Sequence, residues 1–176
     1  MTKLKLTWLL ALPLGAQSFG GPNSLPIVID RSPFHQAPAR TISAELLRYP
    51  LSAKALHMLQ KALQTSEAGD HLGAVKQLQK TLAKCPGTDA YVDSLLGVEY
   101  LKTDQFPEAV DALVQAVKLL PHDASNHANL GLSLIYTGQY DRAEPELRRA
   151  LELDPHNATA SQVLNALAVS KAAPQK

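Results

Sequence analysis

The side chains best suited to covalent chemistry are few and do not converge. Cys85 is the single cysteine of the 176-residue chain and stands beside Pro86 at the end of a predicted helix. A nucleophilic thiol needs a setting that lowers its pKa, such as a helix N-terminus, and none is visible here. One cysteine also excludes an internal disulfide framework and the multi-cysteine zinc patterns. We interpret Cys85 as a small apolar residue at a turn.

The six histidines do not form a metal site either. His122 and His156 recur at an interval of 34 residues, so repetition of a structural unit explains them better than ligation. His122 and His127 are five positions apart, which places them on different faces of any one helix, and no carboxylate pair completes a site. The nine glycines are scattered, and neither GxSxG nor HExxH occurs. We therefore expect no catalytic residues, no metal, no cofactor and no enzyme activity.

The overall charge argues against a nucleic-acid partner. The chain has 17 Lys+Arg and 16 Asp+Glu, a formal charge of +1, whereas binding to phosphates needs a basic excess on one face. Its 45% of hydrophobic residues is ordinary for a folded chain. The sequence therefore predicts a folded protein that does not bind nucleic acid.

Residues 1–18 have the layout of a secretory signal peptide. Lys3 and Lys5 precede an apolar run over residues 6–16, and Ala16-Gln17-Ser18 supplies small residues for cleavage. The alternatives are an uncleaved anchor or a buried helix, but the run is shorter than the ~20 residues that span a bilayer. We expect a secreted or periplasmic protein without stable membrane insertion after cleavage. Removing the two lysines makes the mature chain slightly acidic.

Residues 19–51 are dense in proline, which removes amide donors and restricts the preceding residue. We predict an extended arm, in which residues 25–29 form a short edge strand or lie against an apolar surface elsewhere on the molecule. A solvated linker is the alternative. The prolines are Pro22, Pro26, Pro33, Pro38 and Pro50.

The remaining sequence is built on a repeat of 34 residues. Apolar residues recur at helical steps from Ser52, a predicted N-cap. Matched pairs at this interval mark residues 89–123 and 124–157 as two copies of one unit. The pairs are Gly97 and Gly131, Ala109 and Ala143, Leu113 and Leu147, Ala116 and Ala150, and Pro121 and Pro155.

Each copy predicts a helix hairpin with small residues at its seam. Gly97 lies in the middle of a first helix, where a missing side chain allows the second helix to approach, and Ala109 plays the same part on the second helix. Phe106 fills the wedge where the two helices diverge. Asp104 and Gly138 occupy the turns within the hairpins. The seam is therefore a contact between backbones that approach closely.

Two further segments complete the array. Residues 52–88 form a divergent first copy, aligned by an interval of 35 residues that places Gly69 opposite Asp104. Residues 158–171 form an amphipathic helix that would cap the open end of the array. Residues 172–176 are predicted to be a disordered tail. Pro145 is unusual, because it lies beyond the first turn of its helix unless that helix bends or starts late.

The 34-residue period, the Leu-Gly pair, the alanines and the closing proline resemble the tetratricopeptide repeat. This resemblance implies an all-α fold, a right-handed superhelix of about three helix hairpins plus a capping helix, preceded by the arm. The sequence departs from the family pattern at Asp93 and His127, where a tryptophan is common. The position often held by tyrosine is Tyr100 in one copy and Leu134 in the other.

The resemblance also implies a concave groove lined by the first helices, which receives a partner segment. Some family members grip a C-terminal carboxylate there with lysines and asparagines, but here those places hold leucines and only Asn129 fits. The expected groove is apolar. The implied groove residues are Leu59, Leu63, Tyr91, Leu95, Val98, Leu101, Asn129, Leu132, Ile135 and Tyr136.

The function implied is a protein-protein interaction module, a scaffold or adaptor, that acts outside the cytoplasm and binds an apolar or amphipathic segment of a protein or peptide partner. The alternative is a self-associating structural protein whose groove is filled by its own arm or by another copy, as in a homo-oligomer.

Overall fold

The structure is a computed structural model that describes residues 51–172. The predicted signal peptide and nearly all of the predicted arm, together with residues 173–176, lie outside this range. The described part consists of seven helices. They are α1 (Ala53–Glu67), α2 (His71–Lys84), α3 (Asp89–Lys102), α4 (Phe106–Leu119), α5 (Ala124–Tyr136), α6 (Tyr140–Leu153) and α7 (Ala158–Ala172).

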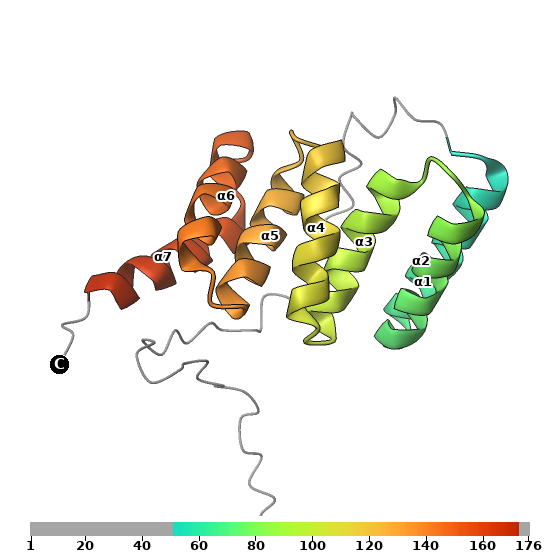
Figure 1. The fold of residues 1–176 in the computed structure, drawn as a ribbon, viewed down its shortest axis with the longest axis horizontal. Coiled ribbons are helices and arrows are strands. Elements are labelled where there is room, and N and C mark those ends of the chain that lie inside the picture. The colour runs from blue at the N-terminus through green and yellow to red at the C-terminus, as the bar shows by residue number, and fades with distance from the viewer. Residues whose placement is uncertain (1–50, 173–176) are drawn as a thin grey trace, which may run out of the picture.

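The helices form a superhelix of hairpins, which confirms the predicted all-α class. The pairs α1–α2, α3–α4 and α5–α6 follow one another along the long axis of the molecule, with α7 at the far end (Figure 1). Each hairpin turns at a residue with a positive φ, which is 87° at Gly69, 59° at Asp104 and 76° at Gly138. Because glycine and aspartate tolerate this left-handed backbone, the three predicted turns are confirmed.

Local signals set where several helices begin. The Ser52 side chain accepts a hydrogen bond from the Ala55 amide, as its predicted N-cap role requires. Asp70 and Asp123 cap α2 and α5 in the same way. α6 begins at Tyr140 and continues through Pro145, so a late start does not explain that proline.

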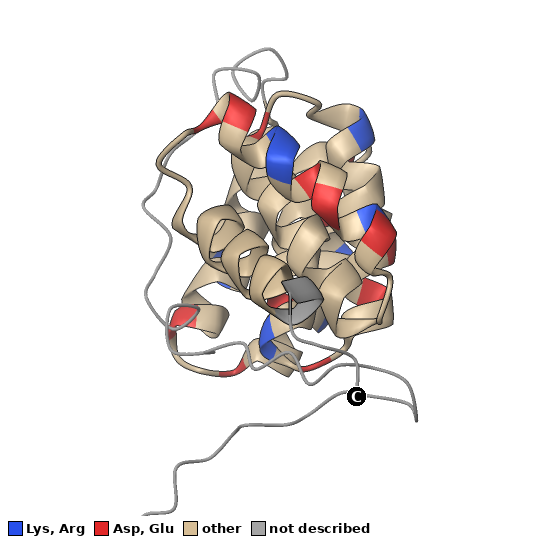
Figure 2. Ribbon diagram, turned by 90° about the vertical axis from the view of Figure 1, so that its left-hand side faces the viewer, with Lys and Arg blue, Asp and Glu red and all other residues tan. Residues whose placement is uncertain are grey.

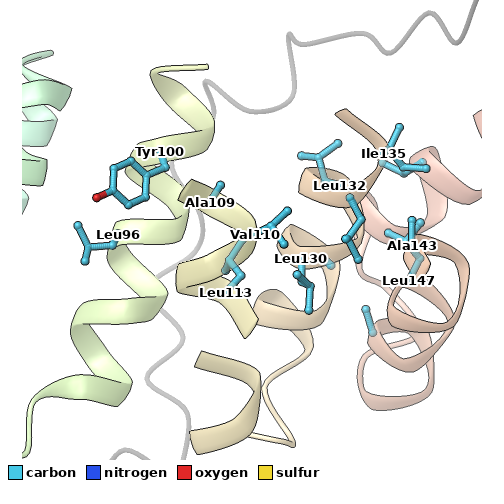
Figure 3. Packing of buried hydrophobic residues seen from close by; sticks show 14 of the residues in the cluster. Leu96, Tyr100, Ala109, Val110, Leu113, Leu130, Leu132, Ile135, Ala143 and Leu147 are labelled. Carbon is cyan, nitrogen blue, oxygen red and sulfur yellow. The ribbon is translucent and has the colours of Figure 1, made fainter. Parts of the chain in front are cut away.

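The core runs along the seams of the hairpins and between them. Ala109 and Ala143 are fully buried, and Gly97 and Gly131 face Leu113 and Leu147 across their seams. Figure 3 shows these leucines and alanines among the side chains that fill the space between α3, α4, α5 and α6. Small residues at the seam are therefore what bring each pair of helices together, as predicted.

Neighbouring hairpins pack through their adjacent helices. α2 contacts α3, α4 contacts α5, and α6 contacts α7. Among the first helices, α3 contacts α5, and α5 contacts α7. α7 buries Ala160, Val163 and Leu167 against the core. No helix within residues 51–172 is long and apolar enough to cross a membrane.

Candidate functional site

The face formed by the first helices retains a row of partly exposed apolar side chains. Leu63 of α1 is 41% exposed. Six other predicted groove residues are half-buried, so that each presents part of its side chain to solvent while the rest packs on the array. These are Tyr91, Leu95, Val98, Leu101, Asn129 and Tyr136. We call these seven residues the first-helix face.

The other three predicted groove residues belong to the core. Leu59 is 6% exposed, Leu132 is 1% exposed and Ile135 is 4% exposed, and the last two appear within the packed cluster in Figure 3. Burial leaves these three side chains little surface for a partner in this structure, and the prediction that they contact one stays a prediction.

The position of α5 in the array accounts for the burial of Leu132 and Ile135. Leu132 and Ile135 stand 34 residues after Val98 and Leu101, which are half-buried. α5 contacts a first-position helix on each side, α3 and α7, whereas α3 has a comparable contact on one side only, with α5. Side chains at equivalent positions of the repeat are therefore buried to different degrees.

Tyr136 is held in place by an aromatic contact between hairpins. Its ring stacks on that of Phe106, with centroids 4.3 Å apart and planes 16° from parallel. Phe106 begins α4, so the contact links the second hairpin to the end of α5. The sequence predicts that Phe106 fills the wedge within its own hairpin; the stacking shows that its ring packs against the next hairpin.

A buried acidic residue ties the first hairpin to the second. The Glu99 side chain is 6% exposed, and its carboxylate accepts hydrogen bonds from Ser66 Oγ at 2.8 Å and from Lys102 Nζ at 2.9 Å. His71 Nδ1 lies 2.9 Å from the other Glu99 oxygen. The cluster therefore joins α1, α2 and α3.

Ser66, His71 and Glu99 are the three residue types of a hydrolytic triad, but their geometry differs from one. In a triad the histidine accepts the serine proton on one nitrogen while the acid holds the other nitrogen. Here Ser66 donates directly to Glu99, and the one His71 nitrogen that approaches Ser66, at 3.5 Å, is the nitrogen that meets Glu99. The arrangement satisfies a buried carboxylate and does not activate the serine.

The sequence carries one signal for this cluster. Glu99 interrupts an otherwise apolar helix between Leu95 and Leu101, and a charged residue is almost never buried unless it is paired. Lys102, the basic side chain at the end of α3, is engaged by this pairing. Lys102, the residue after Leu101 of the first-helix face, therefore already has a carboxylate partner.

Ionisable groups near the start of α3 have altered titration. Partial burial raises the pKa of Asp93 to about 6, and the negative charge of Asp89 adds to this shift. Burial also raises the pKa of Tyr91. Across residues 51–172, no group of three His, Cys, Asp or Glu side chains is arranged to hold a metal ion.

Charges of both signs are distributed over the helices. Figure 2 shows acidic and basic positions intermingled on the side of the molecule that it presents. Residues 51–172 contain 11 Lys+Arg and 14 Asp+Glu, a formal charge of −3. A slight acidity of this kind is unfavourable for binding phosphate backbones.

Comparison with known proteins identifies the same repeat. The family model of the tetratricopeptide repeat matches residues 124–157. No curated protein matches the chain by sequence.

Solved structures extend the similarity to the whole array. The first TPR of Spaghetti (RPAP3), bound to the HSP90 peptide SRMEEVD, superposes with a TM-score of 0.64 and 20% identity over 70% of this chain and 100% of that one. MamA superposes with a TM-score of 0.62 and 23% identity, over 66% of this chain and 68% of that one.

A mutant of the Thermobaculum terrenum O-GlcNAc transferase is also similar, with a TM-score of 0.62 and 28% identity. The match covers 76% of this chain but 25% of the transferase. The likeness is therefore to a quarter of that enzyme.

Proposed function

Because this chain belongs to the tetratricopeptide-repeat proteins, we propose that it is a protein-interaction module whose first-helix face binds an apolar or amphipathic segment of a partner. The observation that carries the proposal is the row of partly exposed side chains on α1, α3 and α5, all of them apolar or aromatic except Asn129. A structural neighbour with the same fold has been solved with an HSP90 peptide bound. Peptide binding is thus an activity that this fold accommodates.

The chemistry of the face favours an apolar partner over an acidic one. Leu63 and Leu95 stand where a receptor for a C-terminal carboxylate would place lysines or asparagines, and Lys102 is paired with Glu99. Desolvating a carboxylate against such a surface without a cation is costly. We therefore expect an EEVD-ended peptide to bind poorly, and an amphipathic segment to dock its apolar side on the face.

We also propose that the protein acts outside the cytoplasm and that it is not an enzyme. Residues 1–18 have the features of a leader, so the protein would act outside the cytoplasm as an adaptor. N-terminal sequencing of the protein purified from its own cells tests this part: a start at residue 17 or 19 supports it, and an intact Met1 contradicts it.

Photo-crosslinking tests the binding face directly. A photoreactive amino acid at Leu95 of the full chain should capture a partner protein in the native cells. The matched control is the same amino acid at Leu72, which is 58% exposed on the second helix α2. Equal capture at both positions would place the binding surface elsewhere.

A second candidate is that the face is filled by the chain's own arm or by another copy. Of these two occupants, charge favours the arm. Residues 19–50 carry three basic and two acidic residues, so the arm is slightly positive, whereas residues 51–172 have a formal charge of −3. Deleting residues 22–47 should then increase partner capture at Leu95. Light scattering over a range of concentrations tests self-association, and a persistent monomer excludes the second copy.

A further inference from the structure

His127 is a buried histidine that connects three parts of the molecule. It lies on α5 with a side chain that is 8% exposed. Its Nδ1 is 2.7 Å from Glu146 Oε2 on α6, and its Nε2 is 3.1 Å from the backbone carbonyl oxygen of Pro121 in the turn between α4 and α5. The imidazole ring thus bridges the second hairpin to both helices of the third.

The two contacts decide how many protons the ring carries. A carbonyl oxygen only accepts hydrogen bonds, and so does an ionised carboxylate. A neutral imidazole has one N–H and one bare nitrogen, which would leave a lone pair facing one of these oxygens. The imidazolium has two N–H groups and satisfies both acceptors.

Two charged side chains of α6 affect whether the His127 ring is protonated. Burial alone lowers the pKa of His127, but the hydrogen bonds to Glu146 and Pro121 and the charge of Glu146 outweigh it, so that the pKa is raised. Arg149 opposes this rise; it lies 2.9 Å from Glu152 and 3.5 Å from His122 Nδ1. Glu146 and Arg149 are the charged groups that influence the ring.

We propose that His127 is held as an imidazolium and acts as a proton-dependent clamp between the second and third hairpins. Protonated, it donates to Glu146 and to Pro121 and joins the turn to α6. Deprotonated, it must give up one of these bonds and leave one of the two acceptors without its donor. The rigidity of this junction therefore depends on the acidity of the medium.

The direction of the pH dependence follows from the raised pKa. The unfolded-state pKa of histidine is about 6.5, and the folded-state value lies above it. The clamp therefore contributes its full stabilisation below about pH 6.5, and loses it as the pH rises through the folded-state pKa.

NMR titration of the histidine ring signals in the full-length protein tests the proposal. The His127 ring should titrate above about pH 6.5, the ordinary value for histidine, because its folded-state pKa is raised. Glu146→Gln, at a partly exposed position, should shift the midpoint of His127 downward. Titration of His127 at or below about pH 6.5 would overturn the proposal.

A stability measurement provides the second test. The difference in unfolding free energy between the natural chain and His127→Gln should be largest at about pH 5.5 and shrink as the pH rises toward about 9. His57→Gln is the control. A difference that stays constant with pH would mean that His127 only fills space. If His127→Gln does not fold, the titrations of the natural chain and of Glu146→Gln decide the matter.

Discussion

Gly97 on α3 lies so close to Leu113 on α4 that a Cβ atom at Gly97 would overlap Leu113 Cγ. The third hairpin repeats the contact, with a Cβ at Gly131 falling 2.5 Å from Leu147 Cγ. Real Cβ atoms do not approach other atoms so closely. The two hairpins are thus closed by the same pairing of a glycine with a fully buried leucine.

We predict that Gly97→Ala and Gly131→Ala each destabilise the protein. Overpacking a close-fitting core costs about 1–3 kcal/mol, which exceeds the roughly 1 kcal/mol that alanine gains over glycine in a helix. The effect should be larger at Gly131, where the added Cβ also meets a backbone oxygen, that of Ala143, at 3.2 Å. Chemical denaturation measures the change.

Gly138→Asn is the matched control for these two variants. Gly138 needs a positive φ but has nothing within 4 Å of an added Cβ, and asparagine tolerates that backbone. Its cost should be smaller. A gain in stability for Gly97→Ala would show that the seam relaxes freely.

Replacing Glu99 should loosen the first hairpin selectively. Glu99→Gln removes the negative charge to which both Lys102 and Ser66 donate hydrogen bonds. It also places an amide N–H group where these donors need an acceptor. We expect a loss of about 1–3 kcal/mol, which is typical for a broken buried hydrogen bond to a charged group. Hydrogen exchange should speed up in α1 and α2 and stay unchanged in α6.

Glu152→Gln provides the comparison for Glu99. Glu152 pairs with Arg149 at 2.9 Å, but its side chain is 64% exposed, and exposed pairs contribute about 0–1 kcal/mol. Equal losses for the two variants would contradict the role of Glu99 as a connection between hairpins.

The repeat architecture could be predicted because small residues at fixed spacing determine how closely two helices approach. Gly97, Ala109 and the turn residue Asp104 each act within one hairpin, so their local sequence contains the information. Residues 1–50, where the leader and most of the arm were predicted, lie outside the described structure, and those interpretations remain predictions.

The burial of each predicted site residue could not be predicted, because it depends on contacts between repeats. Val98 and Leu132 are equivalent in sequence, yet α7 packs against the helix that carries Leu132, and that residue is buried. Similarly, Glu99 meets Ser66 across 33 positions and His127 meets Glu146 across 19. Periodicity assigns a residue to a face, but it does not specify its partners on another helix.

Asp93 should make the folded state less stable as the pH rises. Its pKa is raised from 3.8 to about 6 in the folded state, so folding disfavours the ionised form. Stability is therefore lost as the pH rises from about 4 through about 6. Asp93→Asn should be more stable than the natural chain at pH 7, by on the order of 1 kcal/mol for this partly exposed carboxyl.

The gain from Asp93→Asn should vanish near pH 4, where the natural carboxyl is already largely protonated in the folded state. Thermal unfolding at the two pH values measures this, with the exposed Asp111→Asn as control. A gain of equal size at both values would show that the amide acts through something other than charge.

Pro145 is the clearest local conflict between sequence and fold. It is the sixth residue of α6, which continues through it to Leu153. A proline there cannot donate the hydrogen bond to the carbonyl of Asp141, and its ring crowds that carbonyl, at a cost of up to ~3 kcal/mol. Pro145→Ala should therefore raise the free energy of unfolding by about 1–3 kcal/mol, measured by urea denaturation.

Pro107→Ala is the control, since Pro107 lies in the first turn of α4, where the amide has no partner within the helix. That variant should be neutral or slightly destabilising. If the two substitutions changed stability equally, the helix would have to accommodate Pro145 without strain.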